Sequence, residues 1–561
     1  MAANPSIQLG TDGNWAIKED NLLAYKKDGT RFFNKEFDFT RGSLATFVDK
    51  DGLIKVSGVT NTKLVVNGDF ATNLNGWTNS NNHWQWTSQG AYFPETTTHN
   101  PLSQTLVNDA NVILKFTFTL NIIKGTVNVT YEDSTNASIQ TQYTTSGTYT
   151  IYTTPVEANT TIYFSRYGGI NTEFYLNNVS AFEIQTDVPR IDFTDDTTGH
   201  LLLEPQSTNL IPYSEDIGNS AWTTNSAGTI KTLDDSKIAP DNSSGVYKIE
   251  NNSSSSNSPF CEDVINLTNG TTYTFSVYLY NDGSISNDNS YIYIYDTVNG
   301  QRKTYIDASR TNEWYRLTIT AEIDISSTLE TCGVQLSSGD GDSIYFWGAQ
   351  VEEGYATSYI PTEGSIKTRL QDVCNNAGSS DLINSTEGVL YAEISALADD
   401  ETNREITLSD GTTNNYVLIR FNSGGSNRIY TRVDVNTSVE YFELNTSYNI
   451  TDNNKIAIRY KNSDFATFIN GTKVDFQLSG NTFPSNTLNK INFDNGDGGN
   501  DFYGNVKSVA VFKEALTDEE LAKITSTTQQ EAFYEMRDKM LQINADYYEF
   551  GDYTTRLKKL F

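Results

Sequence analysis

The sequence predicts an all-β chain of tandem β-sandwich domains that ends in a short α-helix, and three observations favour this fold. Its 561 residues exceed what one hydrophobic core usually holds. Asn, Thr, Ser, Asp, Gly and Tyr are abundant, whereas charged residues make up only 19% of the chain, a composition typical of strands joined by short polar turns. Apolar and polar residues alternate in stretches such as 112–120 and 148–153, which is the period of a half-buried strand.

The formal net charge of −31 argues against binding to nucleic acid or to an anionic membrane, because both need basic patches. Solubility is the simplest interpretation of this acidity, and bound divalent cations or electrostatic steering are the alternatives. The three cysteines, Cys261, Cys332 and Cys374, have no paired spacing, so the sequence predicts buried free thiols without a disulfide framework or a zinc site.

The first ten residues lack the basic segment and the apolar segment that an export signal contains. A membrane-spanning helix needs about 18 consecutive apolar residues, and no stretch of the sequence comes near that length. We therefore expect synthesis and folding in the cytoplasm. Aromatic-rich sandwiches usually work outside cells, and a virion protein, which is assembled inside a cell and used outside it, fits both expectations.

Residues 1–59 form the first predicted segment, a small β-rich attachment segment. Asp51-Gly52 separates two apolar runs and is a hairpin signal, so a strand, a turn and a second strand are expected around it.

Two motifs carry a resemblance to a known group of proteins. Residues 38–54 read DFTRGSLATFVDKDGLI, and residues 189–222 include PRIDF, LLLEPQSTNL and YSED. Together they resemble phage tail and tail-fibre-like structural proteins, in which the second motif follows soon after the first. Here residues 55–188 separate them, which predicts an inserted domain over 60–187.

The ends of this insert, Leu64–Trp77 and Phe174–Ile184, resemble the first and last strands of jelly-roll carbohydrate-binding modules. The same plan repeats over 188–369, where Asn209–Trp222 opens it and Ile344–Tyr355 closes it. Two tandem jelly rolls are therefore expected, with Trp77, Trp222 and Trp347 in their cores.

Residues 370–525 follow the strand order of concanavalin A-like (laminin-G, pentraxin) domains, with strands expected at 388–394, 455–460, 465–472 and 504–512. The remaining segment, 526–561, places Phe533, Met536 and Met540 at helical spacing. This amphipathic helix is expected to pack on its own sandwich, with subunit contact or virion docking as the alternatives.

Catalytic chemistry has little support in the sequence. The three histidines, His83, His99 and His200, form no ligand-spaced pair, and no familiar acid–base carboxylate motif is present. The sequence therefore predicts a protein that is not an enzyme.

Two acidic turns contain the oxygen ligands that calcium prefers. They are Asp340-Gly341-Asp342 and the turn that holds Asp494, Asp497 and Asp501. The resemblance to jelly-roll modules, which often carry a structural calcium, implies the same cofactor.

Sugar binding needs an aromatic ring for the C–H face of a pyranose, flanked by amide and carboxyl groups. The best candidate is in the insert: if 83–86 is a strand, Trp84 and Trp86 point to one face. Packing of these tryptophans in the jelly-roll core is the favoured alternative. The candidate glycan-binding residues are His83, Trp84, Gln85, Trp86 and Tyr92.

These observations and the resemblance predict a non-catalytic phage virion appendage, a tail fibre or receptor-binding protein that contacts host-surface glycans and other phage structural proteins. Homo-oligomerisation is expected because weak glycan contacts gain avidity in bundles, and the resemblance implies a trimer. A capsid-attached head fibre or decoration protein, a bacterial surface adhesin and a glycan-cleaving depolymerase are the alternatives.

Overall fold

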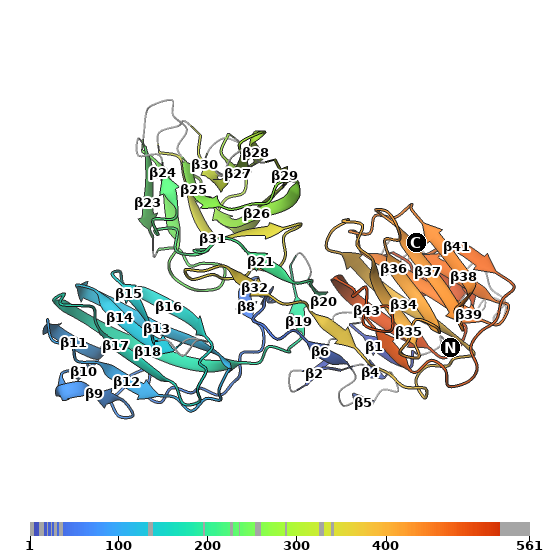
Figure 1. The fold of residues 1–561 in the computed structure, drawn as a ribbon, viewed down its shortest axis with the longest axis horizontal. Coiled ribbons are helices and arrows are strands. Elements are labelled where there is room, and N and C mark those ends of the chain that lie inside the picture. The colour runs from blue at the N-terminus through green and yellow to red at the C-terminus, as the bar shows by residue number, and fades with distance from the viewer. Residues whose placement is uncertain are drawn as a thin grey trace, which may run out of the picture. The chain divides into compact units, whose positions relative to one another are not determined.

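The computed structural model describes residues 5–527, apart from 11–15, 19–20, 24, 27–30, 33–36, 133–137, 195–196, 225–227, 235, 253–259, 286–288, 325–329 and 338–340. The chain forms two compact units. We call residues 41–195 and 206–371 the jelly-roll unit, and residues 1–40, 196–205 and 372–561 the terminal unit. Nearly all regular structure is β, which confirms the predicted fold class (Figure 1).

The first sandwich of the jelly-roll unit is a ten-strand jelly roll. Its strands are β9 (Thr78–Asn79), β10 (Gln85–Thr87), β11 (Gly90–Thr96), β12 (Leu102–Thr105), β13 (Ile113–Lys124), β14 (Val127–Glu132), β15 (Ser138–Tyr143), β16 (Gly147–Thr153), β17 (Thr161–Arg166) and β18 (Thr172–Ile184). A 3-10 turn, η2 (Ser80–Asn82), follows β9. The two sheets have the orders β10-β11-β18-β13-β16 and β15-β14-β17-β12-β9.

The second sandwich repeats this topology strand for strand. Its strands are β22 (Thr223–Thr224), β23 (Thr229–Leu233), β24 (Tyr247–Asn251), β25 (Phe260–Ile265), β26 (Thr271–Tyr280), β27 (Tyr291–Asp296), β28 (Gly300–Tyr305), β29 (Trp314–Ile323), β30 (Glu330–Gln335) and β31 (Ser343–Glu353). The sheet orders are β23-β24-β31-β26-β29 and β28-β27-β30-β25-β22, so each strand has its counterpart in the first jelly roll.

Both cores form because alternate residues of each strand are apolar and point between the two sheets. A tryptophan just before the first strand closes each core: Trp77 donates its indole N–H to the carbonyl of Asn67 at 3.2 Å, and Trp222 donates to the carbonyl of Tyr213 at 2.9 Å. Trp347 is buried as well. The predicted core positions of Trp77 and Trp222 are therefore confirmed. Trp347 instead belongs to a separate buried cluster on the outer side of β31, so its predicted core position is wrong.

A short connecting region in the same unit holds β7 (Thr46–Val48), β8 (Ile54–Val56), β19 (Arg190–Asp192), β21 (Ser207–Asn209) and β32 (Lys367–Arg369). β7 and β8 form the hairpin that Asp51-Gly52 predicts, and Gly52 takes the positive φ of 77° that the turn needs.

The two ends of the first jelly roll meet in this region. Val59 and Ile184 form an antiparallel bridge, and the amide of Gln185 donates to the carbonyl of Gly58 at 2.8 Å. A Cβ on Gly58 would lie 1.9 Å from the Gln185 carbonyl oxygen, so this approach requires glycine. The first jelly roll thus interrupts the connecting region at one point and returns to it.

Arginines of the two sequence motifs hold the connecting region together. Arg41 donates to the carbonyl of Thr186 at 2.7 Å, and the amide of Arg41 donates to Asp187 at the same distance. Arg190, fully buried, donates to the carbonyl of Thr46 at 2.9 Å. The residues that carry the phage-like resemblance therefore have structural roles.

The terminal unit is a third sandwich. One sheet contains the path β41-β40-β39-β34-β43-β1-β4-β5, with β20 also paired to β43, and the other has the order β38-β37-β36-β35-β42. Their bounds are β1 (Ile7–Leu9), β4 (Tyr25–Lys26), β5 (Arg31–Phe32), β20 (His200–Leu203), β34 (Glu387–Ala396), β35 (Arg404–Ser409), β36 (Tyr416–Phe421), β37 (Ile429–Val435), β38 (Ser438–Asn445), β39 (Asn454–Lys461), β40 (Phe465–Ile469), β41 (Thr472–Gln477), β42 (Lys490–Asn492) and β43 (Gly504–Phe512). Two small pairs complete it: β2 (Ala16–Lys18) with β3 (Asn21–Leu23), and β6 (Asp38–Thr40) with β33 (Val373–Asn375).

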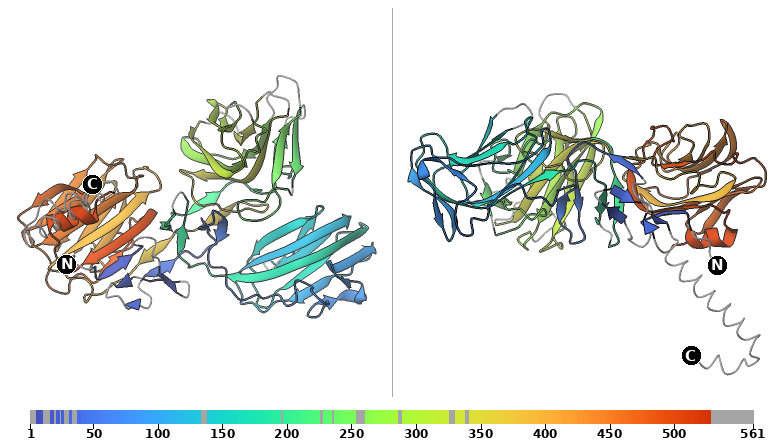
Figure 2. Two further views of the ribbon diagram at one scale, coloured as in Figure 1. Left: turned by 180° about the vertical axis from the view of Figure 1, so that it is seen from behind. Right: turned by 90° about the horizontal axis from the view of Figure 1, so that it is seen from below.

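Helix α1 (Asp518–Ile524) covers the outer face of the larger sheet with Leu521 (Figure 2). Thr517 and Glu520 form a capping box at its start. The helix predicted around Phe533 and Met540 lies outside the described residues. Among the residues that are described, no helix is long and apolar enough to cross a membrane.

The N-terminal segment differs from the expectation of a separate attachment segment over 1–59. Strand β1 pairs with β43 through Ile7 and Val511, and both residues are buried. The first strand thus extends the sheet of the last sandwich and satisfies an edge of β43 that would otherwise be unpaired.

Candidate carbohydrate-binding surfaces

The two candidate tryptophans, Trp84 and Trp86, do not form an exposed platform. Strand β10 begins at Gln85, and Trp86 pairs with the fully buried Ala91, so Trp84 and Trp86 both lie on the inner side of the sheet. Trp84 is 3% exposed and packs edge-on against Phe93 at 5.0 Å. Trp86, at the sheet edge, is 44% exposed. Trp84 is therefore a core residue, and the idea of a paired tryptophan platform is wrong.

Hydrogen bonds to the backbone also restrain these tryptophans and their neighbour. The indole of Trp84 donates to the carbonyl of Asn100 at 2.8 Å, and that of Trp86 to the carbonyl of Phe70 at 2.7 Å. His83 shares a hydrogen bond of 3.1 Å with the carbonyl of Pro94. The roles of His83 and Trp86 in glycan binding stay predictions.

Gln85 and Tyr92 lie on the opposite, outer face of the same sheet, as register partners on β10 and β11. Tyr92 stacks on Tyr175 of β18 with ring centroids 4.8 Å apart, and its hydroxyl donates to Glu173 at 2.6 Å. This hydrogen bond raises the pKa of Tyr92 to about 12. Tyr175 and Glu173 were not identified from the sequence, because only the strand register brings them beside Tyr92.

The second jelly roll has one sheet face that is covered. On the outer side of β31, Trp347 and Tyr345 pack with Ile54 of the hairpin, with Ala239 and with Tyr359 in a buried cluster. On the outer face of the other sheet, Lys303 and Tyr305 of β28 are exposed.

On that second sheet, tyrosines alternate with core residues along β27. Ile292 and Ile294 belong to the core, so Tyr291 and Tyr293 lie on the outer face, where neighbouring side chains leave Tyr291 only 8% and Tyr293 only 1% exposed. Gly333 of β30 lies directly between Tyr293 and Glu262 in the register. The Tyr293 hydroxyl reaches past this glycine and donates to Glu262 at 2.5 Å. A Cβ on Gly333 would lie 2.2 Å from the carbonyl oxygen of Cys261.

Polar groups surround these rings. Tyr291 donates to Gln301 at 3.0 Å, and Gln301 donates to Gln335 at 3.0 Å. The Lys303 ammonium lies 4.1 Å above the Tyr291 ring, and Tyr305, 56% exposed, meets that ring edge-on at 5.7 Å.

We call this surface the tyrosine face, and it consists of Glu262, Tyr291, Tyr293, Gln301, Lys303, Tyr305 and Gln335. Its one largely exposed ring, Tyr305, can stack on sugar C–H groups, and its amide, ammonium and carboxylate groups can form hydrogen bonds with hydroxyls. The sequence analysis did not single out these residues. The one signal in the sequence is the alternation Tyr-Ile-Tyr-Ile-Tyr over 291–295.

The acidic turns use their carboxylates within the fold. Asp340 lies outside the described residues, and the buried Asp342 accepts a hydrogen bond from Ser337. Asp494 accepts from the amide of Gly496 at 2.6 Å. Asp501 accepts from Tyr503 at 3.1 Å, and burial raises the pKa of Asp501 to about 6.

Asp497 is an exposed member of the same turn. In the part of the chain that the structure describes, no three His, Cys, Asp or Glu side chains gather closely enough to hold a metal ion. Calcium binding at Asp494, Asp497 and Asp501 stays a prediction that a calcium-dependent thermal shift would check.

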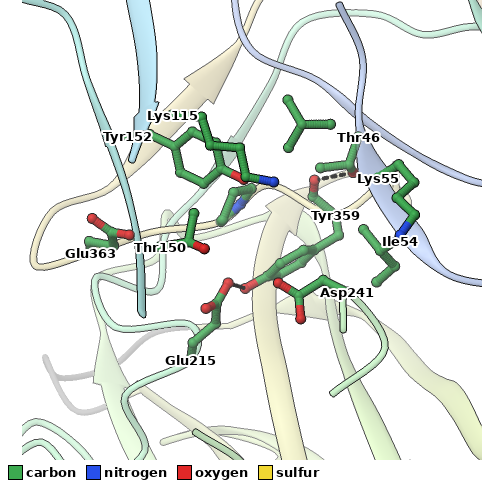
Figure 3. Close-up of a pocket in the computed structure, with 12 residues that line it drawn as sticks. Thr46, Ile54, Lys55, Lys115, Thr150, Tyr152, Glu215, Asp241, Tyr359 and Glu363 are labelled. Atoms are coloured by element: carbon green, nitrogen blue, oxygen red, sulfur yellow. Dashed lines mark hydrogen bonds between the residues drawn. The ribbon is translucent and has the colours of Figure 1, made fainter. Parts of the chain in front are cut away.

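A small cavity of about 80 Å³ lies within the jelly-roll unit (Figure 3). Lys115 and Tyr152 line it from the first jelly roll, and Glu215, Asp241 and Tyr359 from the other side. This volume is well below the about 300 Å³ at which ligand pockets usually begin, so the cavity is not a candidate glycan site.

Burial shifts the pKa values of the ionisable side chains that line this cavity. Burial raises the pKa of Glu215 well above its ordinary value, and the nearby carboxylates of Asp241 and Glu363 add to the rise. Burial lowers the pKa of Lys115. Tyr359 donates to Glu215 at 2.9 Å and accepts, through its carbonyl, a hydrogen bond of 2.6 Å from Thr46. These hydrogen bonds connect separate segments of the jelly-roll unit around the cavity.

Comparison with known proteins points to the second jelly roll. A family model described as "Carbohydrate binding domain" (CBM_4_9) matches residues 214–343, the span that contains the tyrosine face. This match supports carbohydrate binding by a jelly-roll domain, and a domain of this type binds without catalysis. No curated protein matches the chain.

Solved structures with similarity to the chain include two bacterial carbohydrate-binding examples. The CBM40 of a Ruminococcus gnavus IT-sialidase is 13% identical, with 27% of this chain and 94% of that chain covered and a TM-score of 0.23. The tandem CBM22-1-CBM22-2 domain of Paenibacillus barcinonensis Xyn10C is 11% identical, with 53% and 98% covered and a TM-score of 0.22. At these TM-scores the likeness carries no argument, and the family match alone supports the assignment.

Proposed function

We propose that this chain is a non-catalytic glycan-binding protein and that its second jelly roll binds the glycan on the tyrosine face. The observation that carries the proposal is that residues 214–343 match the carbohydrate-binding model and also present the exposed Tyr305 ring, with the exposed Lys303 and the half-buried Gln301 on the same strand. Stacking of one pyranose of an oligosaccharide on Tyr305, with further sugar units extending across the sheet toward Gln301 and Glu262, is the expected mode of binding.

We further propose that the chain serves as a phage virion appendage that contacts host-surface glycans, either on the tail or, as the second candidate, on the capsid. The motifs of residues 38–54 and 189–222, which resemble phage tail structural proteins, support this role. The proposal includes assembly with other phage structural proteins and homo-oligomerisation, because weak glycan contacts then gain avidity.

The test of glycan binding is a glycan array with the full chain, followed by titration calorimetry with the best ligand. Tyr305→Ala, at a largely exposed position, removes a stacking ring without opening the core, and we expect a loss of affinity of about tenfold or more. Glu262→Gln keeps the size of the side chain and weakens its hydrogen bonding.

Tyr167→Ala is the matched control, because Tyr167 is an exposed tyrosine in a turn of the first jelly roll. Equal affinities of the Tyr305 variant and the unmodified chain would show that the tyrosine face is not the binding site. Immunogold labelling of purified phage particles would test the virion role, and unlabelled particles would contradict it.

A further inference from the structure

The third sandwich presents another aromatic surface, on the outer face of the β38-β37-β36-β35-β42 sheet. Thr431 and Tyr441 point into the sandwich, where their hydroxyls meet that of Thr467 at 2.6 and 2.9 Å. Alternate residues of β36, β37 and β38 therefore point outward. We call these outward side chains the arginine–aromatic face, and they are Arg420, Tyr430, Arg432, Phe442 and Leu444.

Buried carboxylates hold both arginines in place. Arg420 pairs with Glu405 of β35 at 2.7 Å, and Glu405 also accepts from Asn500 at 2.7 Å. Arg432 forms a two-pronged contact with Asp434, with both N–O distances 2.6 Å. Glu405 and Asp434 are buried, whereas the guanidinium-bearing side chains are partly exposed. Their positions are thus fixed before any ligand arrives, which lowers the entropy cost of binding.

Aromatic rings complete the face. The Arg420 guanidinium lies 5.3 Å from the centroid of Tyr430, and the rings of Tyr430 and Phe442 lie 6.3 Å apart at 35°. Phe442 is 59% exposed, and Leu444 beside it is also exposed. An exposed phenylalanine next to two oriented guanidinium groups gives the surface apolar and hydrogen-bonding character at once.

We propose that the arginine–aromatic face is a second binding site, for a neutral saccharide. The C–H face of a pyranose fits on Phe442 and Tyr430, and the guanidinium groups are placed to donate to its hydroxyl oxygens. Because the two arginines are neutralised by Glu405 and Asp434, the face carries no net positive charge that would favour an acidic sugar. The choice of a saccharide rests on the proposed function, and the site itself is separate from the tyrosine face.

The test uses the full chain and an array of neutral gluco-, galacto- and manno-oligosaccharides, with uronate-containing oligosaccharides for comparison. We expect Tyr305→Ala to leave residual binding to neutral probes. Phe442→Ala, added to the Tyr305→Ala variant, should lower this residual affinity by about tenfold or more. Phe476→Ala is the matched control, because Phe476 is a similarly exposed phenylalanine (55%) on β41 of the other sheet.

Each other outcome has a separate meaning. If Tyr305→Ala alone abolishes all binding, the arginine–aromatic face is not a site and the proposed function stands. If Phe442→Ala alone abolishes binding, the inference stands and the tyrosine face is not the site. If Phe442→Ala changes only the molar mass in light scattering, the face is a contact between copies and the inference is overturned. Absence of binding to every probe would overturn both proposals.

Discussion

Replacement of Trp84 and Trp86 separates a core position from a surface position within three residues of sequence. Trp84 is 3% exposed, packs on two phenylalanines and donates one hydrogen bond, so Trp84→Ala should cost about 3–5 kcal/mol. Trp86 is 44% exposed and donates one hydrogen bond, so Trp86→Ala should cost only about 1–2 kcal/mol.

Differential scanning calorimetry of the full chain measures both changes. For a domain of this size the loss in Trp84→Ala corresponds to a fall of about 10–20 °C in the melting temperature of the first jelly roll, against about 5 °C in Trp86→Ala. The transition of the third sandwich, which belongs to the terminal unit, should not move and provides an internal control. Equal shifts for the two variants, or a larger shift for Trp86→Ala, would refute the assignment of Trp84 to the core.

Three further predictions concern the jelly-roll unit. Replacement of residues 60–183 by an Asn-Gly turn should leave a chain that folds, as judged by calorimetry, and that keeps glycan binding on the tyrosine face, as judged by titration. Aggregation of this variant would argue against the close approach of the two ends of the first jelly roll. Glu215→Gln should raise the melting temperature at pH 8 and leave it unchanged at pH 4. Burial raises the pKa of Glu215 above its ordinary value of 4.5, so the folded state of the unmodified chain loses stability as the pH rises from 4.5 toward the raised pKa. The Gln variant should lack this loss, and scanning calorimetry at the two pH values measures it. Gly333→Ala should cost about 1–3 kcal/mol in denaturant unfolding and weaken glycan binding, because its Cβ would collide with the backbone of β25; a neutral effect would contradict that packing.

The sequence predicted the all-β fold class because strand alternation and turn residues are local signals. It also predicted the burial of Trp77 and Trp222, since each precedes the first strand of a jelly roll. The pairing of β1 with β43 was not predictable in this way, because it joins residues about five hundred positions apart through backbone hydrogen bonds that leave no side-chain signature.

The candidate sites were harder to predict for the same reason. Tyr293 and Glu262 meet only because Gly333 lies between them in the sheet, and three separate strands supply these residues. In contrast, the 83–86 segment suggested a platform from sequence alone, but the inner side of a sheet edge and an exposed face have the same alternation. The register of neighbouring strands distinguishes them.

The paired ends of the first jelly roll bear on how such a chain can exchange a domain. Because the chain departs at Gly58 and returns at Gln185 through hydrogen-bonded neighbours, another module with adjacent ends can take the same place without a change in the surrounding scaffold. Recombination at this point would exchange a whole jelly roll in one step, whereas point mutation alters one contact at a time.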